Sequence, residues 1–182
     1  VYSEGAVTVL LGNKEMAIEW SRNTGRPMIQ VVGIGHACES TYVGRGLPHQ
    51  NIHLIESDMV AAKRAYEMAG ITPKNISVVG QHCAFGPQGL ITLAMMGFAE
   101  LGHAQDLVYN GTIMDGGSLC VDPYGGLIYA GHAVGASNMM SLYEVYHYMI
   151  EHEKEHGAVH GTGGADAVYG GVWILRNKGV RS

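Results

Sequence analysis

The chain has 182 residues, 47% of them hydrophobic and only 15% charged, which excludes a disordered chain and predicts one folded domain with a sizeable core. The net charge of -5 comes from 11 basic and 16 acidic residues without a basic block, so we expect no nucleic-acid partner. Three cysteines, odd in number and without a C-x-x-C spacing, argue against a disulfide framework and favour a reducing, cytoplasmic location. The longest apolar run, residues 89–99, is too short for a membrane span, and the sequence does not open with a leader pattern, so no membrane association is expected.

Glycine is the strongest deviation in composition, with 27 positions that follow no repeat period. Since glycine has no side chain, this abundance predicts tight turns and close approaches between backbone segments. The low charged fraction predicts that part of the surface is covered by subunit contacts, and we expect a homo-oligomer.

The first 54 residues predict a strand, a helix, a second strand and a loop. The β-rich run 6–11 predicts the first strand, and the helix lies around Met16–Trp20 and ends near Gly25. The nearly continuous apolar run 28–34 is typical of a strand buried on both faces. Residues 36–54 show no hydrophobic period, which predicts a long loop of the kind that carries function.

Residues 57–102 predict two helices with a strand between them. Ser57 is suited to cap the first helix, and Gly70 is suited to end it. Residues 76–79 form the expected strand. Pro87 suits the first turn of the second helix, which Gly102 closes.

The remaining residues predict turns, one long helix and a final strand. Residues 108–129 are rich in glycine and leave room for one short strand, and Ser137 is suited to cap a helix that ends near Glu155. The final strand, 167–175, is expected to be interrupted by its glycine pair at 170–171. Strands that alternate with helices in this way predict a layered α/β core.

Two histidines lie where an expected strand gives way to a helix: His82 in QHCAFGP and His132 in GHAVGAS. Ligands bind at such junctions in α/β folds because helix starts present free amides and a partial positive charge. Each histidine taken alone is more typical of a structural residue, and the two together indicate a site and a structural role about equally. A third feature, His160 to Gly164, predicts a glycine-rich turn whose amides could form an oxyanion hole, although such turns are more often only turns.

The segment His152-Glu153-Lys154-Glu155-His156 satisfies the H-E-x-x-H pattern of zinc proteases, and His160 has the spacing of a third ligand. The segment lies at the end of the expected long helix and is followed at once by Gly157. A zinc site needs a supported helix, so we expect no metal here and keep a zinc hydrolase as an alternative.

Several segments, in chain order, resemble the C-terminal half of the thiolases. The run 82–85, His-Cys-Ala-Phe, resembles the family's asparagine-glutamate-alanine-phenylalanine box, or its histidine-aspartate-cysteine-phenylalanine version in archaeal and sterol-carrier-type thiolases. Residues 125–138 resemble the glycine-histidine-proline box, with Ala133 in place of the proline and Asn138 in place of a glycine. Residues 160–164 resemble the final cysteine-x-glycine box in the branch where histidine replaces the cysteine.

This resemblance covers nearly the whole chain and implies a thiolase-like, five-layer αβαβα fold, of which the chain supplies mainly the C-terminal half. Residues 1–27 would form the end of the N-terminal half and residues 28–182 the C-terminal domain. The segment before His160 is short for the family and leaves little room for the strand expected there.

The resemblance implies an acyl-CoA C-acyltransferase that cleaves or forms 3-ketoacyl-CoA by Claisen chemistry. Coenzyme A would be a substrate, and no separate cofactor is implied. The nucleophilic cysteine would lie outside this chain, in the N-terminal thiolase half or in a companion chain. Relatives that lack the cysteine-x-glycine box also suggest a small partner with a zinc ribbon and an OB-fold.

The resemblance also assigns roles to residues. His132 would activate the nucleophile and help bind the thioester oxygen, His82 would hold a water or carbonyl in the same oxyanion hole, and the amide near Thr162 would line a second hole. Cys83 lies one residue earlier than the cysteine of the family's box. The catalytic candidates are His132, His82, His160 and Cys83, and the candidates for binding substrate or coenzyme A are Phe85, Gly131, Gly135, Ser137, Thr162, Gly163 and Gly164.

Two further hypotheses about the function stay open. A thiolase-fold retro-aldolase acting on a hydroxyacyl-CoA fits the missing acid/base cysteines. A half that serves only in assembly would need none of these side chains for catalysis.

Overall fold

A mixed five-stranded sheet forms the centre of the molecule, with helices on both faces. The computed structural model describes residues 2–39, 55–114, 116–164 and 168–179. The strands lie in the order β1-β5-β4-β2-β3, with β2 parallel to β3 and β4, and β5 antiparallel to β4 and β1. Their bounds are Ile29–Cys38 (β1), Val78–Gly80 (β2), Cys120–Val121 (β3), His156–Gly163 (β4) and Tyr169–Asn177 (β5).

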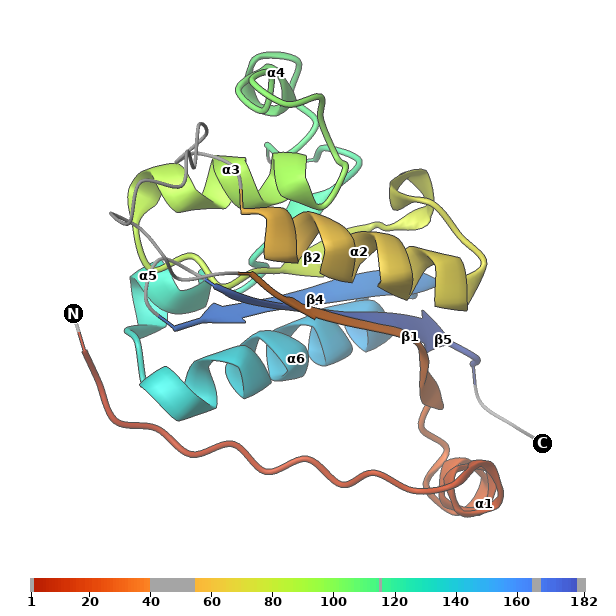
Figure 1. Cartoon of the computed structure of the whole chain (residues 1–182). Coiled ribbons are helices and arrows are strands. Elements are labelled where there is room, and N and C mark those ends of the chain that lie inside the picture. The colour runs from red at the N-terminus through yellow and green to blue at the C-terminus, as the bar shows by residue number, and fades with distance from the viewer. Residues whose placement is uncertain (1, 40–54, 115, 165–167, 180–182) are drawn as a thin grey trace.

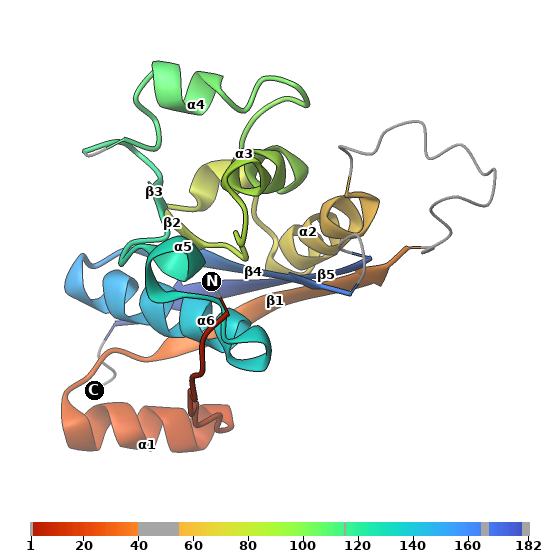
Figure 2. The same cartoon turned by 90° about the vertical axis from the view of Figure 1, so that its left-hand side faces the viewer.

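Helices α2 and α3 cover one face of the sheet and α6 covers the other, so the fold has three layers (Figure 1). Helix α1 and the extended segment before it lie outside these layers (Figure 2). The helix bounds are Lys14–Thr24 (α1), Glu56–Ala69 (α2), Gly86–Met95 (α3), Asp106–Tyr109 (α4), Gly126–Ala130 (α5) and Val134–Glu151 (α6). The α/β fold class predicted from the alternation of elements is confirmed.

Successive strand residues point to opposite layers, which gives the sheet two cores. Val79 of β2 and Ala158 of β4 are fully buried in the core that includes α2 and α3. Their chain neighbours Val78 and Val159 belong to the core against α6. Both faces of the central strands are therefore apolar, as a sheet covered on both sides requires.

Three strand glycines let helix α2 lie directly against β1 and β5. A Cβ atom on Gly35 would stand 1.8 Å from the carbonyl oxygen of Ala61, and one on Gly33 would stand 2.2 Å from that of Ala65. A Cβ atom on Gly170 would stand 2.6 Å from a carboxylate oxygen of Asp58. Part of the glycine excess thus serves a close approach between backbones, as predicted.

An asparagine caps the start of α1, and glycines end α1 and α2. The Asn13 side chain accepts the Met16 amide at 2.9 Å and caps α1, which ends before Gly25. Gly25 and Gly70 both have φ +67, so both predicted helix ends are confirmed.

The predicted strand at 6–11 is wrong. These residues are extended but form no ladder in the described part of the chain, and Leu10 and Leu11 are 91% and 67% exposed. An extended segment becomes a strand only when its backbone N–H and C=O groups form hydrogen bonds with another strand. The run 28–34 does form a strand, but β1 lies at the sheet edge and its residues alternate in burial, so it is not buried on both faces. Most of the predicted loop, residues 40–54, lies outside the described residues.

Four predicted helix boundaries are also wrong. The cap of α2 is Ile55, two residues before Ser57, and the cap of α6 is Ala133, four residues before Ser137. Helix α6 ends at Glu151 rather than near Glu155. Helix α3 stops at Met95 rather than near Gly102, because the chain turns at Gly97 with φ +82.

The glycine-rich segment before β5 is not a turn but strand β4, which pairs along its whole length with β5. His160 therefore lies within a strand, and the strand for which the sequence left little room is present. The glycine pair at 170–171 does not interrupt β5, since both residues take part in this pairing. No helix of the described segments is long and apolar enough to span a bilayer.

Candidate functional site

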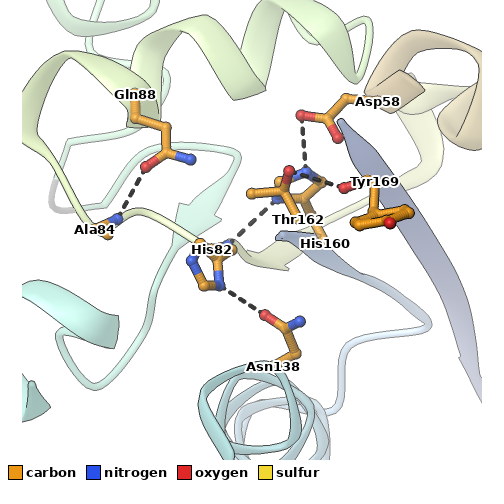
Figure 3. Close-up of polar contacts among 8 residues, drawn as sticks. All are labelled: Asp58, His82, Ala84, Gln88, Asn138, His160, Thr162 and Tyr169. Carbon is orange, nitrogen blue, oxygen red and sulfur yellow. Dashed lines mark hydrogen bonds and ion pairs between the residues drawn. The ribbon is translucent and has the colours of Figure 1, made fainter. Parts of the chain in front are cut away.

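His82 lies just after β2 and is held by the first turns of α6. Its Nδ1 stands 2.7 Å from Oδ1 of Asn138, an oxygen that can only accept, so the ring proton is on Nδ1 (Figure 3). Burial lowers the pKa of His82, and the neighbouring His132 and His160 lower it further. His82 is thus neutral at pH 7, and its Nε2 carries a lone pair.

His132 faces His82 from the turn between α5 and α6. The two rings meet edge to face with centroids 4.8 Å apart. Nδ1 of His132 lies 2.9 Å from the hydroxyl of buried Ser137, which can donate or accept. The Nε2 atom of His132 can therefore act as a base in one step and as a donor in another. The Tyr2 ring also stacks on His132, with the ring centroids 5.8 Å apart.

His160 is completely buried on β4, beneath the loop that carries His82. Its Nδ1 accepts the backbone N–H of His82 at 3.3 Å, and its Nε2 stands 3.0 Å from Oδ2 of Asp58 on α2 (Figure 3). Asp58 is also completely buried. The structure thus brings together the three histidines that the sequence singled out, and it adds an acid that the sequence analysis missed.

Cys83 points away from this cluster. The His82 side chain turns toward α6, whereas the Cys83 sulfur lies against α3, where a Cβ on Gly89 would be 3.1 Å from it. The thiol donates to the carbonyl oxygen of Phe85 at 3.4 Å. Burial raises the pKa of the Cys83 thiol, and the nearby Asp122 raises it further, so the sulfur is not an activated thiolate.

Three of the predicted binding residues flank the histidines along the chain. Gly131 ends α5 with φ +88, a conformation that favours glycine and that turns the chain into His132. Gly135 is exposed in the first turn of α6. Phe85 at the start of α3 is 73% exposed and free to contact a bound molecule.

The other predicted binding residues lie at the end of β4. The Thr162 hydroxyl donates to the carbonyl oxygen of Tyr169 at 2.9 Å, Gly163 ends the strand and Gly164 follows with φ +82 (Figure 3). Thr162 and Gly163 border a cavity of about 330 Å³ between α6 and the sheet. Asn138, which holds His82, also lines this cavity, together with Met139, Leu142, Val159 and Trp173.

The H-E-x-x-H segment does not form a zinc site. His152 caps the end of α6, whereas His156 is the first residue of β4, so the two do not share a helix face. Within the part of the chain that the structure describes, no group of three or more histidine, cysteine, aspartate or glutamate side chains could hold a metal ion.

Two acids lie behind the histidine cluster. Asp122 follows β3, and its Oδ1 accepts the backbone N–H of Gln81 at 2.7 Å. Burial raises the pKa of Asp122 to about 6. Glu144 of α6 is buried, and burial together with the charge of Asp122 raises its pKa to about 7.

We expect Glu144→Gln to raise the free energy of unfolding at pH 8 by on the order of 2 kcal/mol and to change it little at pH 4. The pKa of Glu144 is about 7 in the folded protein against an ordinary 4.5, so the folded state binds more protons between these values. The free energy of unfolding of the wild type therefore falls as pH rises through this window. A neutral glutamine removes the part of this fall that comes from the ionisation of Glu144. Urea unfolding from pH 4 to 8 measures the free energy of unfolding of both proteins. Glu100→Gln, at an exposed position, is the control. Parallel pH profiles for the wild type and Glu144→Gln would contradict the prediction.

Asp58 and Asp122 escaped the sequence analysis because an acid near a helix start or a turn is ordinarily a surface residue. In the folded chain, a glycine makes room for each of these acids. A Cβ on Gly170 would collide with the Asp58 carboxylate, and one on Gly126 would stand 2.9 Å from the Asp122 carboxyl carbon.

Comparison with known proteins identifies the family. A family model described as thiolase C-terminal domain-like matches residues 48–175. The chain belongs to this family. The predicted resemblance to the C-terminal half of the thiolases is thereby confirmed, as is the thiolase-like α/β fold.

Curated relatives of this thiolase-like chain carry two kinds of name. An acetyl-CoA acetyltransferase of Methanocaldococcus jannaschii is 36% identical over 58% of the chain and 27% of its own length. One of Methanothermobacter thermautotrophicus is 29% identical over 92% of the chain and 44% of its own length. Sterol carrier protein 2 of Bos taurus is 33% identical over 58% of the chain and 19% of its own length. The chain thus spans less than half the length of these relatives.

A solved structure of an Ltp2-ChsH2(DUF35) aldolase has the same fold. It superimposes with a TM-score of 0.62 over 84% of this chain and 40% of its own chain, at 20% sequence identity. At this identity the match establishes the thiolase-like architecture.

Proposed function

We propose that this chain supplies the carbonyl-binding histidines of a thiolase-type active site that acts on acyl-CoA thioesters. The observation that carries the proposal is the meeting of His82 and His132, whose rings are 4.8 Å apart. Asn138 and Ser137 of α6 engage the Nδ1 atoms of the two rings, so both Nε2 atoms are left to face a substrate.

The proposed reaction is acyl transfer through Claisen chemistry. A cysteine thiol outside this chain gives its proton to Nε2 of His132, and the thiolate adds to the C3 carbonyl of a 3-ketoacyl-CoA. The C2–C3 bond breaks, its electron pair forms a thioester enolate, and C2 takes up one proton, which replaces the proton that the thiol lost. The Nε2–H of His132 donates to the enolate oxygen. A water held by Nε2 of His82 donates a second hydrogen bond to it, since that nitrogen itself can only accept. The acyl group on the sulfur then passes to free coenzyme A.

The nucleophilic cysteine would come from an N-terminal thiolase half or from a companion chain. The lengths of the acetyltransferase relatives, of which the chain matches less than half, support this division. Coenzyme A enters as substrate. The cavity between α6 and the sheet, lined by Leu142, Trp173 and Met139, is suited to the apolar part of an acyl group.

Denaturing mass spectrometry of the full assembly, before and after addition of acetyl-CoA and longer acyl-CoA compounds, tests the proposal. We expect an added acyl mass on a cysteine outside residues 1–182. The absence of an acylated cysteine across the series would refute acyl transfer.

A retro-aldol cleavage of a hydroxyacyl-CoA is the second candidate, and two observations favour it. The neutral Nε2 of His82 can take the proton of a 3-hydroxyl group, and Cys83 is turned away from the cluster. The fold is also that of a solved Ltp2-ChsH2(DUF35) aldolase, and the two components in this name support a companion of the DUF35 kind. Cleavage that continues without free coenzyme A would select this reaction, whereas strict dependence on coenzyme A would exclude it.

A further inference from the structure

The hydrogen bonds of two successive backbone N–H groups fix the position of His82. The N–H of Gln81 donates to Oδ1 of Asp122 at 2.7 Å, and the N–H of His82 donates to Nδ1 of His160 at 3.3 Å. These two acceptors come from different segments, one after β3 and one on β4. Together they hold the chain at the point where β2 ends and the His82 side chain begins.

The second acceptor is itself oriented by Asp58. Since Nδ1 of His160 receives an N–H group, the proton of the neutral ring must lie on Nε2, which stands 3.0 Å from Oδ2 of Asp58. Both side chains are 0% exposed, so neither can touch a substrate. An acid buried in this way is costly unless a partner compensates it, and β5 makes room for it with a glycine at position 170.

We propose that Asp58 and His160 are a buried positioning pair that fixes the His82 backbone, and thereby aims the His82 ring at the substrate carbonyl. Asp58 selects the ring tautomer of His160 in which Nδ1 accepts. If the proton moved to Nδ1, two N–H groups would face each other and the peptide before His82 would have to move. The role in aiming His82 rests on the proposed function, whereas the pairing itself does not.

Asp58→Asn in the full protein tests the pair, because the asparagine amide can donate to Nε2 and so favour a proton on Nδ1. We expect the imidazole ¹⁵N shifts of His160 to report this change of tautomer, and the His82 amide to exchange with solvent at least tenfold faster. A displaced His82 should lower kcat by about 10²-fold with little change in KM. Asp106→Asn, which alters an exposed aspartate 3.4 Å from His103, is the matched control and should change none of these quantities.

Unchanged His160 shifts and an unchanged His82 exchange rate in folded Asp58→Asn would overturn the proposal. Should this variant not fold, His160→Asn and His160→Leu decide instead. The asparagine oxygen can replace Nδ1 as the acceptor of the His82 N–H. His160→Asn should therefore retain a higher kcat, and a slower exchange of the His82 amide, than His160→Leu. Equal values for the two variants would refute the role of the pair. If the wild-type assembly does not cleave the C2–C3 bond of any 3-ketoacyl-CoA or 3-hydroxyacyl-CoA, the proposed function fails and the tautomer and exchange measurements alone decide the pairing.

Discussion

Replacement of His132 by alanine is expected to lower kcat of the full assembly by about 10³-fold, while the fold is retained. The ring is half-buried and contacts Tyr2, His82 and Ser137, and none of these contacts ties it to the main core. The large loss follows from the two roles that we propose for His132, as the base that activates the nucleophile and as the donor to the enolate oxygen.

Steady-state kinetics with a 3-ketoacyl-CoA measures this loss, and a thermal melt checks the fold. His103→Ala is the control, since that ring is exposed and pairs with Asp106 on the surface. If kcat of His132→Ala equals that of the wild type, this chain serves assembly and not catalysis.

Gly35→Ala is expected to lower the free energy of unfolding by about 3 kcal/mol or more. The added methyl would stand 1.8 Å from the Ala61 carbonyl oxygen and 2.8 Å from the Ala65 nitrogen, which both belong to the backbone of α2. Backbone atoms cannot rotate away as a side chain does, so the helix must move off the sheet or β1 must bend.

Gly171→Ala is the matched control, because it adds the same methyl to another strand glycine, where the nearest atom, the carbonyl oxygen of Gly161, would be 3.8 Å away. Urea unfolding of the two variants gives the difference. Equal stabilities would mean that α2 is free to shift on the sheet, and that the close approach at Gly35 does not constrain the fold.

Local chemistry made much of the fold predictable from the sequence. Gly25 and Gly70 end helices because the chain there needs a positive φ, which can be recognised from neighbouring residues alone. Strand β4 was not predicted, because it depends on pairing with distant strands and not on local chemistry. Glycine-rich backbone at 157–164 has little strand propensity of its own, and it is a strand because β2 and β5 pair with it on both sides.

The same distinction separates the site residues. His82 and His132 were found because each lies at a junction between elements, beside glycine or a helix start, which leaves a pattern in the sequence. Asp58 was not found, because its importance comes from a strand 102 positions further along the chain, where His160 stands. Burial of an acid depends on what packs over it, and this is decided by the tertiary fold.

The pairing of β1 bears on how the chain folds. Within the described residues, β1 (Ile29–Cys38) has β5 (Tyr169–Asn177) as its ladder partner, so its ladder hydrogen bonds are made with residues about 140 positions further along the chain. Such long-range closure slows folding, and during synthesis the strand leaves the ribosome well before its partner exists. A nascent chain stalled before residue 169 therefore carries an apolar strand without its ladder partner, and we expect it to be more prone to aggregation than the complete chain.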